Sequence, residues 1–263
     1  MSILFIVFLW AYAESFRIGV TRVDMRGTPF STILSGKTVV QLTDLHMHAL
    51  GYREEKTLAI LEGIKPDMIF LTGDYIPWHG DVQVALSFLA RLNPPLGAFG
   101  VMGDYDYSNS RASCLYCHKA NTSLPTQAHG VHMLKNEQVQ LTLDGKNLVI
   151  MGLDYNGKEN NSHVNRLLHD KGQEPMIVLS HNPLRFDDMD KQQKILMVSG
   201  DTHGGQLYLP SFLWHALGYE KNARYNQGLF HEGQNTLFVS RGVGTSHVPF
   251  RLFCPPEIVV YQF

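Results

Sequence analysis

The chain of 263 residues is long enough to bury a substantial core, in one large domain or two small ones. Its formal net charge of -2 at neutral pH provides no basic surface, so we expect no nucleic acid among its partners. The three cysteines are too few for a disulfide framework, whereas the 13 histidines favour metal binding without locating a site.

The chain begins with an uncharged, strongly apolar run over residues 2–13. A bilayer-spanning helix needs about 20 such residues, and no positive region precedes the run as in a signal peptide. A buried strand or a helix packed on the domain would account for it. We favour a third interpretation, in which residues 1–15 are a hydrophobic segment left from a membrane anchor and residues 16–263 form the folded domain.

Three arginines follow the apolar run directly, at Arg17, Arg22 and Arg26. Positive residues beside a membrane segment favour the cytoplasmic side. The sequence therefore predicts a membrane-associated protein on the cytoplasmic face, with the outer face left open as the alternative.

Short apolar runs alternate with amphipathic segments through the first half of the chain. The runs at 39–42, 68–71 and 98–102 are typical of buried strands, and an aspartate follows each of them closely. Helical spacing at 54–64 and 81–92 predicts helices between them, the second with Asp81 as its N-cap. Such alternation favours parallel strands joined through βαβ units, which places the three acidic strand ends at one edge of one sheet.

The second half is richer in alternating apolar and polar residues. Segments 139–143 and 148–151 flank Asp144-Gly145, which predicts a β-hairpin. A short helix is expected at 164–170. Further strands are predicted at 16–25, 176–179, 195–198, 236–240 and 257–261. Because no repeat or linker interrupts the chain, one domain built around two sheets is the simplest account.

Carboxylates and imidazoles follow five of these strands. They are Asp44, His46, Asp74, Asp104, His181, Asp201 and His203. Such side chains suit a pair of divalent cations about 4 Å apart, which share a carboxylate and neutralise a phosphoryl group. Turn aspartates are common after strands, so one alone would say little. Seven such residues at strand ends favour a metal site.

This order of motifs resembles the calcineurin-like metallophosphoesterases, especially their bacterial branch with a membrane-anchored amino terminus. The resemblance extends from about residue 39 to the end of the chain. It is carried by Asp44-Leu-His46, Gly73-Asp74, Gly103-Asp104-Tyr105-Asp106, Ser180-His181-Asn182-Pro183 and Gly200-Asp201-Thr202-His203. It implies an α/β fold, a four-layer α/β/β/α sandwich of two mixed β-sheets flanked by helices, for a metallophosphoesterase domain over residues 16–263.

The resemblance also implies two divalent ions, of Mn, Mg, Fe or Zn. Asp44, His46 and His203 would hold the first, and Asp74 would bridge to the second. The remaining ligands of the second ion would be His181, Asp104 and Asp201. The implied reaction is hydrolysis of a small phosphomonoester or phosphodiester through a metal-bound hydroxide. If the amino terminus anchors the protein, a phospholipid or a lipid-linked pyrophosphate is the natural substrate.

Three positions depart from the family pattern: Asp104 replaces Asn, Tyr105 replaces the His that assists the leaving group or binds phosphate, and Asp201 replaces His. Four carboxylates then oppose two divalent ions, so the site is less positive and polarises phosphate less. Tyr105 and Asp106 occupy the catalytic positions. A phenol with an ordinary pKa of about 10 is a poor acid but still a hydrogen-bond donor. We therefore expect reduced or shifted activity.

Two alternatives remain open at this point. A family member that lost these groups would act as a non-catalytic binding protein. Separately, Cys114, Cys117 and His118 fit the C-x-x-C-H pattern for attachment of c-type haem, which would make the protein a redox variant. A chance match or a cysteine pair explains that pattern equally simply.

Overall fold

The computed structural model describes residues 3–107, 116, 129–155, 168 and 174–263. In this part of the chain, two six-stranded sheets pack face to face. Across sheet 1 the strands are β1 (Gly19–Asp24), β12 (Glu257–Gln262), β2 (Thr38–Leu42), β3 (Met68–Thr72), β4 (Ala98–Val101) and β5 (Val131–Met133). Across sheet 2 they are β10 (Gly228–Glu232), β11 (Asn235–Val239), β9 (Ile195–Ser199), β8 (Met176–Ser180), β7 (Lys146–Leu153) and β6 (Glu137–Leu143).

Both sheets are mixed. The consecutive strands β2, β3 and β4 are parallel, whereas β12 runs antiparallel to β2. In sheet 2, β7, β8, β9 and β11 are parallel and the two edge strands are antiparallel. The predicted strands are confirmed, although the first is shorter than expected. Strands β5 and β10 were not predicted, because one has only three residues and the other lies partly exposed at an edge.

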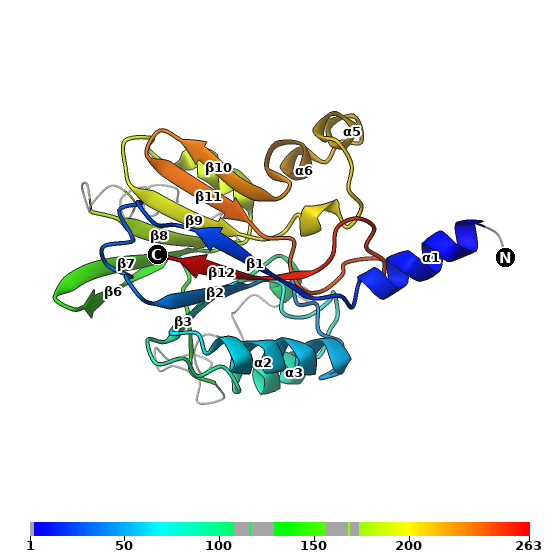
Figure 1. The fold of residues 1–263 in the computed structure, drawn as a ribbon, viewed down its shortest axis with the longest axis horizontal. Coiled ribbons are helices and arrows are strands. Elements are labelled where there is room, and N and C mark those ends of the chain that lie inside the picture. The colour runs from blue at the N-terminus through cyan, green and yellow to red at the C-terminus, as the bar shows by residue number, and fades with distance from the viewer. Residues whose placement is uncertain (1–2, 108–115, 117–128, 156–167, 169–173) are drawn as a thin grey trace.

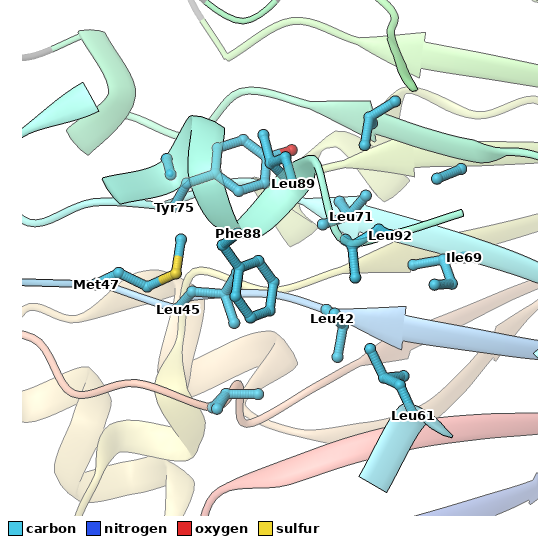
Figure 2. Close-up of a cluster of buried hydrophobic side chains, with 14 of the residues drawn as sticks. Leu42, Leu45, Met47, Leu61, Ile69, Leu71, Tyr75, Phe88, Leu89 and Leu92 are labelled. Atoms are coloured by element: carbon cyan, nitrogen blue, oxygen red, sulfur yellow. The ribbon is translucent and has the colours of Figure 1, made fainter. Parts of the chain in front are cut away.

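Helices α2 (Tyr52–Ile64) and α3 (Val82–Leu89) cover the outer face of sheet 1 (Figure 1). Figure 2 shows Leu61 of α2, Phe88 of α3 and Leu71 of β3 in the buried cluster that forms this layer. The N-cap prediction is confirmed, since the Asp81 side chain accepts a hydrogen bond of 2.9 Å from the backbone N–H of Gln83. The two helices therefore pack against the outer face of β2, β3 and β4 and stabilise the positions at which these strands end.

The layer between the sheets follows from the alternation of side chains along each strand. Phe70 of β3 and Phe99 of β4 face sheet 2, where they meet Ile177 and Leu196 in a hydrophobic core. The outer face of sheet 2 packs against Phe186, in one of the short helices that cover it. This arrangement confirms the predicted four-layer α/β/β/α sandwich.

The remaining helices are short, and several follow strand ends. They are η1 (Tyr105–Tyr107), η2 (Pro183–Asp188), η3 (His203–Gly205), α5 (Ser211–Ala216) and α6 (Glu220–Tyr225). The predicted hairpin is confirmed, because Asp144 and Gly145 adopt φ of 49° and 76° between β6 and β7. The helix predicted at 164–170 lies, apart from Leu168, outside the described residues.

Helix α1 (Ile3–Glu14) projects away from the domain (Figure 1). Its apolar side chains are exposed on all sides, and Phe8 and Trp10 retain 58% and 52% of their accessible surface. Near its end, Ala11 and Glu14 are buried against the domain. The interpretation of this segment as a buried strand is therefore wrong. None of the described helices has the length and apolar character needed to cross a bilayer.

Candidate metal centre

The ends of strands from both sheets meet at one place. The Gln41 side chain of β2 donates hydrogen bonds of 2.9 Å to the hydroxyl of Thr72 and to the carbonyl of Ser199, which joins the two sheets just below their carboxyl ends. Two residues after Ser199, the backbone N–H of Asp201 donates a hydrogen bond of 3.1 Å to a carboxylate oxygen of Asp44. Side chains that follow five strands thus face one small volume.

All seven predicted ligands are brought together there, in three groups whose donor atoms lie within 4.8 Å of one another. The first group is Asp44, His46 and His203; the bridging group is Asp44, Asp74 and His181; the second group is Asp104, His181 and Asp201. Mixed carboxylate and imidazole sets of this kind fit divalent ions such as Mn, Mg, Fe or Zn.

The first group converges through two imidazole nitrogens. The Nε2 atoms of His46 and His203 lie 3.0 Å apart, and a carboxylate oxygen of Asp74 lies 3.4 Å from the former. Burial lowers the pKa of His46 to about 4 and that of His203 well below its ordinary value, so both rings are neutral at pH 7. Neutral imidazoles facing one another and a carboxylate are the form in which histidine binds metals.

The second group is arranged around a histidine that is held in one orientation. Nδ1 of His181 lies 2.7 Å from the carbonyl of Thr72 and donates to it. Burial would lower the pKa of His181, but the charges of Asp74 and Asp201 raise it well above its ordinary value, so the ring is a cation among these carboxylates. Its buried Nε2 atom lies 3.3 Å from a carboxylate oxygen of Asp104 and 3.5 Å from one of Asp74, and a metal ion that bound there would displace the proton.

Asp201 has a cationic partner that was not predicted. Its carboxylate lies 2.5 Å from the ammonium group of Lys221 on α6. Burial raises the pKa of Asp201, whereas the charges of His181 and Lys221 oppose that change. Lys221 also lines a cavity of about 520 Å³ that Asp74, Asp104 and Tyr105 share.

The backbone around the ligands is strained. Five of the seven adopt left-handed φ angles, namely Asp44 at 51°, His46 at 43°, Asp74 at 56°, Asp201 at 75° and His203 at 52°. Non-glycine residues rarely adopt such angles, and they cluster at functional sites where the surrounding structure enforces them. Each of these turns aims its side chain away from the strand direction and toward the shared volume.

Two glycines allow these turns for different reasons. Gly73 has a φ of 94°, and a Cβ atom there would lie 2.7 Å from Nδ1 of His181. Gly103 has no unusual φ, but a Cβ atom would collide with the carboxylate of Asp74. Gly73 therefore permits a sharp turn, whereas Gly103 is required for the close approach of two loops.

Comparison with known proteins identifies the family. The sequence model of the calcineurin-like phosphoesterases matches residues 37–209. The chain belongs to the calcineurin-like phosphoesterase family. This confirms the resemblance to the family and makes the protein a metallophosphoesterase, a metal-dependent phosphoric ester hydrolase.

Several relatives match this phosphoesterase over most of their length. The uncharacterized metallophosphoesterase YkuE of Bacillus subtilis is 28% identical over 95% of this chain and 87% of its own. The UDP-2,3-diacylglucosamine pyrophosphatase LpxG of Chlamydia muridarum is 26% identical over 98% of this chain and 93% of its own. The phosphodiesterase YaeI of Escherichia coli is 26% identical over 85% of this chain and 81% of its own.

Tyr105 of the phosphoesterase lies at the mouth of the first group. Its ring contacts that of His46 edge to face at 4.7 Å, and its backbone N–H donates to Asp74 at 3.1 Å. The hydroxyl lies 3.2 Å from Nε2 of His247. Burial raises the pKa of Tyr105 to about 12, so the phenol remains a hydrogen-bond donor at neutral pH.

Asp106 lies beneath the ligand turns. Its fully buried carboxylate accepts hydrogen bonds from the backbone N–H groups of Asp74, Tyr75 and Gly103, at 2.8, 3.0 and 2.9 Å. Burial raises the pKa of this carboxyl to about 8, and the N–H group of Gly103 opposes that change. Its contacts tie the turn after β3 to the turn after β4.

Arg251 is a buried residue that the sequence reasoning missed. Its guanidinium donates to the carbonyls of Gly244 at 2.7 Å and His203 at 3.3 Å, and its backbone N–H donates to the carbonyl of Ala11 at 3.0 Å. A single arginine in an irregular tail carries no sequence signal. The haem pattern at Cys114, Cys117 and His118 lies outside the described residues.

Proposed function

We propose that this phosphoesterase hydrolyses a phosphate ester or pyrophosphate bond of a lipid-linked substrate while it is associated with a membrane. The observation that carries this proposal is the exposed apolar helix α1. Its last turns contact Arg251, and Arg251 also contacts His203 in the metal centre. The relatives named as a UDP-2,3-diacylglucosamine pyrophosphatase and a phosphodiesterase support this class of substrate.

Helix α1 has the composition of a segment in an apolar medium. It carries no charged residue before Glu14, and it is apolar on every side. A helix of this kind is stable when an apolar phase surrounds it. Its 12 residues extend about 18 Å, which is close to the depth of one hydrocarbon leaflet, about 15 Å. We infer that, within the hydrophobic segment over residues 1–15, the exposed turns before Ala11 enter one leaflet, while Ala11 and Glu14 stay packed on the domain over residues 16–263.

Aromatic and basic side chains surround the end of α1 that joins the domain. The guanidinium of Arg17 lies 5.9 Å from the centre of the Trp10 ring, and that of Arg53 lies 5.2 Å from the Phe16 ring. Tryptophan and basic residues are enriched where proteins meet lipid headgroups, and basic residues attract anionic lipids. The three arginines at 17, 22 and 26 favour the cytoplasmic leaflet.

The segment between α1 and the cavity places the site close to this surface. The ring of Phe250 lies 5.6 Å from that of Phe8, and the next residue, Arg251, contacts both Ala11 and His203. Val248 and Phe253 in the same segment are 51% and 72% exposed. A phosphate group attached to a lipid can therefore reach the cavity while its chains remain in the bilayer.

The side chains have distinct roles in the proposed reaction. A divalent ion in the first group supplies positive charge for the phosphoryl group and lowers the pKa of water at the site. Tyr105, which stays protonated, donates a hydrogen bond to a phosphate oxygen. Asp106 acts as a positioning residue through its three backbone contacts. Asp74, which lies between the two groups, would be a ligand shared by them, as the family resemblance implies.

Vesicle flotation tests the membrane component. The full chain is expected to float with vesicles of phosphatidylcholine and phosphatidylglycerol, whereas a Phe5→Glu, Phe8→Glu variant remains in the dense fraction, because charge opposes entry of α1. Leu229→Glu is the matched control, since this residue is 42% exposed but lies on β10 at the far edge of sheet 2. Sedimentation of the unaltered chain away from vesicles would contradict the proposal.

Hydrolysis assays test the chemical component. A soluble aryl phosphodiester should be hydrolysed with Mn or Mg and not after chelation, at equal rates by the chain and its α1 variant. A diacylated nucleotide pyrophosphate embedded in vesicles should be hydrolysed faster by the unaltered chain. Failure to hydrolyse either substrate with any metal would favour the non-catalytic binding protein. Rates ordinary for the family would contradict the expectation of reduced activity.

A further inference from the structure

The second group already holds a positive charge. The ammonium of Lys221 lies 2.5 Å from a carboxylate oxygen of Asp201, which is one of the three residues of this group. The two side chains are 31% and 11% exposed, so water screens the contact only in part. Within the described residues, this is the ion pair that joins a lysine or arginine to one of the seven candidate ligands.

Helix α6 presents Lys221 from a fixed position. The side chain of the following residue, Asn222, donates to the carbonyl of Thr202 at 2.9 Å, directly after Asp201. One turn further on, Arg224 pairs with Asp187 of η2 at 2.5 Å. These two contacts, both directly after Lys221 in the chain, hold the helix against the turn that follows β9 and against η2, so the lysine reaches the site from a supported backbone.

The surroundings of the ammonium group also favour a cation at this point. It lies 5.9 Å from the centre of the Tyr155 ring, and that ring lies 5.8 Å from the ring of His181. An aromatic ring, a carboxylate and an ammonium group thus lie together beside the ring of His181.

We propose that Lys221 supplies the second positive charge of the site, so that the protein binds one divalent ion in the first group instead of two. The inference rests on the proposed metal-dependent function and concerns its metal count. A second divalent ion bound through Asp201 would lie close to the ammonium, and like charges at that distance repel strongly. Asp201, at the position where the family has histidine, thereby pairs with a lysine instead of binding a second metal ion.

The arrangement also gives the lysine access to substrate. Lys221 lines the same cavity as Asp104 and Tyr105, and a lysine ammonium is a compact charge that binds phosphate oxygens well. A phosphate in this cavity would then lie between the ion of the first group and the ammonium of Lys221, where the family places its second metal.

Metal counting tests the inference. Each protein is saturated with Mn, passed through a desalting column and assayed for bound metal by mass spectrometry. We expect one ion per chain for the unaltered protein and for Lys221→Arg, which keeps the charge, and two for Lys221→Met. Lys191→Met is the matched control, since this lysine pairs with Glu232 at 3.3 Å on the surface and should leave the count at one.

Two results would overturn the inference: two ions in the unaltered protein, or one ion in a folded Lys221→Met. Electron paramagnetic resonance of the unaltered Mn-loaded protein gives a test that needs no variant, because an isolated ion and an exchange-coupled pair have different spectra. A coupled spectrum would overturn the inference. Absence of bound metal would instead contradict the proposed function, and one bound ion without hydrolysis would leave the inference intact while the function fails.

Discussion

The first and second groups of the metal centre differ in how their charges are balanced. The first joins two neutral imidazoles to Asp44, which is fully buried and, among the described residues, forms no ion pair with a lysine or arginine. The second joins two carboxylates to His181, and a lysine compensates one of them. The first group is therefore incomplete without an ion, whereas the second has a cation built into the chain.

This difference shows that the ligand count alone does not determine the metal count. Asp201 is a good oxygen ligand in isolation. Its neighbour on α6 changes what it can bind, because an oxygen already paired with an ammonium is a weaker metal ligand. Substitutions that act on one group or on both test this difference, and their expected effects decrease from His46→Asn to Tyr105→Phe.

Substitution of one histidine from each group should have unequal effects. His46→Asn removes a ligand from the first group, and we expect most of the bound metal to be lost and kcat/KM to fall by at least about 100-fold. The His181→Asn variant should keep its bound metal, and its kcat/KM should fall by about 10-fold. Metal analysis and kinetics on the same preparations measure both quantities. Equal loss of metal from the two variants would show that the groups act as one site.

Asp106→Asn should weaken both groups together, because its carboxylate accepts from Asp74 on one side and Gly103 on the other. An amide offers one oxygen and leaves backbone N–H groups unpaired, so we expect the free energy of unfolding to fall by about 2 kcal/mol. Urea denaturation measures this. Asp67→Asn is the control, since Asp67 accepts one backbone N–H, from Thr38, at the opposite end of the strands. A similar loss in both variants would refute the role as a shared support.

Gly103→Ala should displace the carboxylate that bridges the two groups. The added methyl group would collide with Asp74, and overpacking of this kind costs about 1 to 2 kcal/mol. The melting temperature and the affinity for metal should both fall. Gly130→Ala meets nothing within 4 Å and should leave both unchanged. Unaltered metal binding by Gly103→Ala would mean that Asp74 is free to move.

Tyr105→Phe should have the smallest effect, confined to the mouth of the first group. It removes a hydroxyl near His247 and keeps the ring against His46, so we expect kcat/KM to fall about fivefold, as for one hydrogen bond, without loss of metal. Tyr208→Phe, at an exposed position, serves as the control. A loss as large as that of His46→Asn would give Tyr105 a greater role than a single hydrogen bond.

The strand ends were predictable because two simple signals coincide there. An apolar run marks each of β2, β3 and β4, and the connection through helices requires these strands to be parallel, so Asp44, Asp74 and Asp104 had to share an edge. Sheet 2 brings His181 and Asp201 to the same edge through its own parallel strands. Hydrophobic patterning and chain topology were sufficient for this part.

Lys221, His247 and Arg251 were not predictable from the same signals. Each lies in a segment without strand or helix periodicity, and its position depends on how the chain folds back over the finished sheets. The sequence likewise could not determine whether α1 is buried or exposed, since an apolar run is equally compatible with burial in a core and with exposure to lipid. Contacts between segments distant in sequence decide all four.

The left-handed angles at five ligands have a consequence for the evolution of this chain. Each costs roughly 1 kcal/mol relative to glycine, and crowded carboxylates add repulsion, so the folded state is least favourable where the chemistry takes place. Selection for thermostability alone would replace Asp44 or Asp201 by glycine and discard the ligand. A chain that retains both residues gives up stability for the capacity to bind an ion.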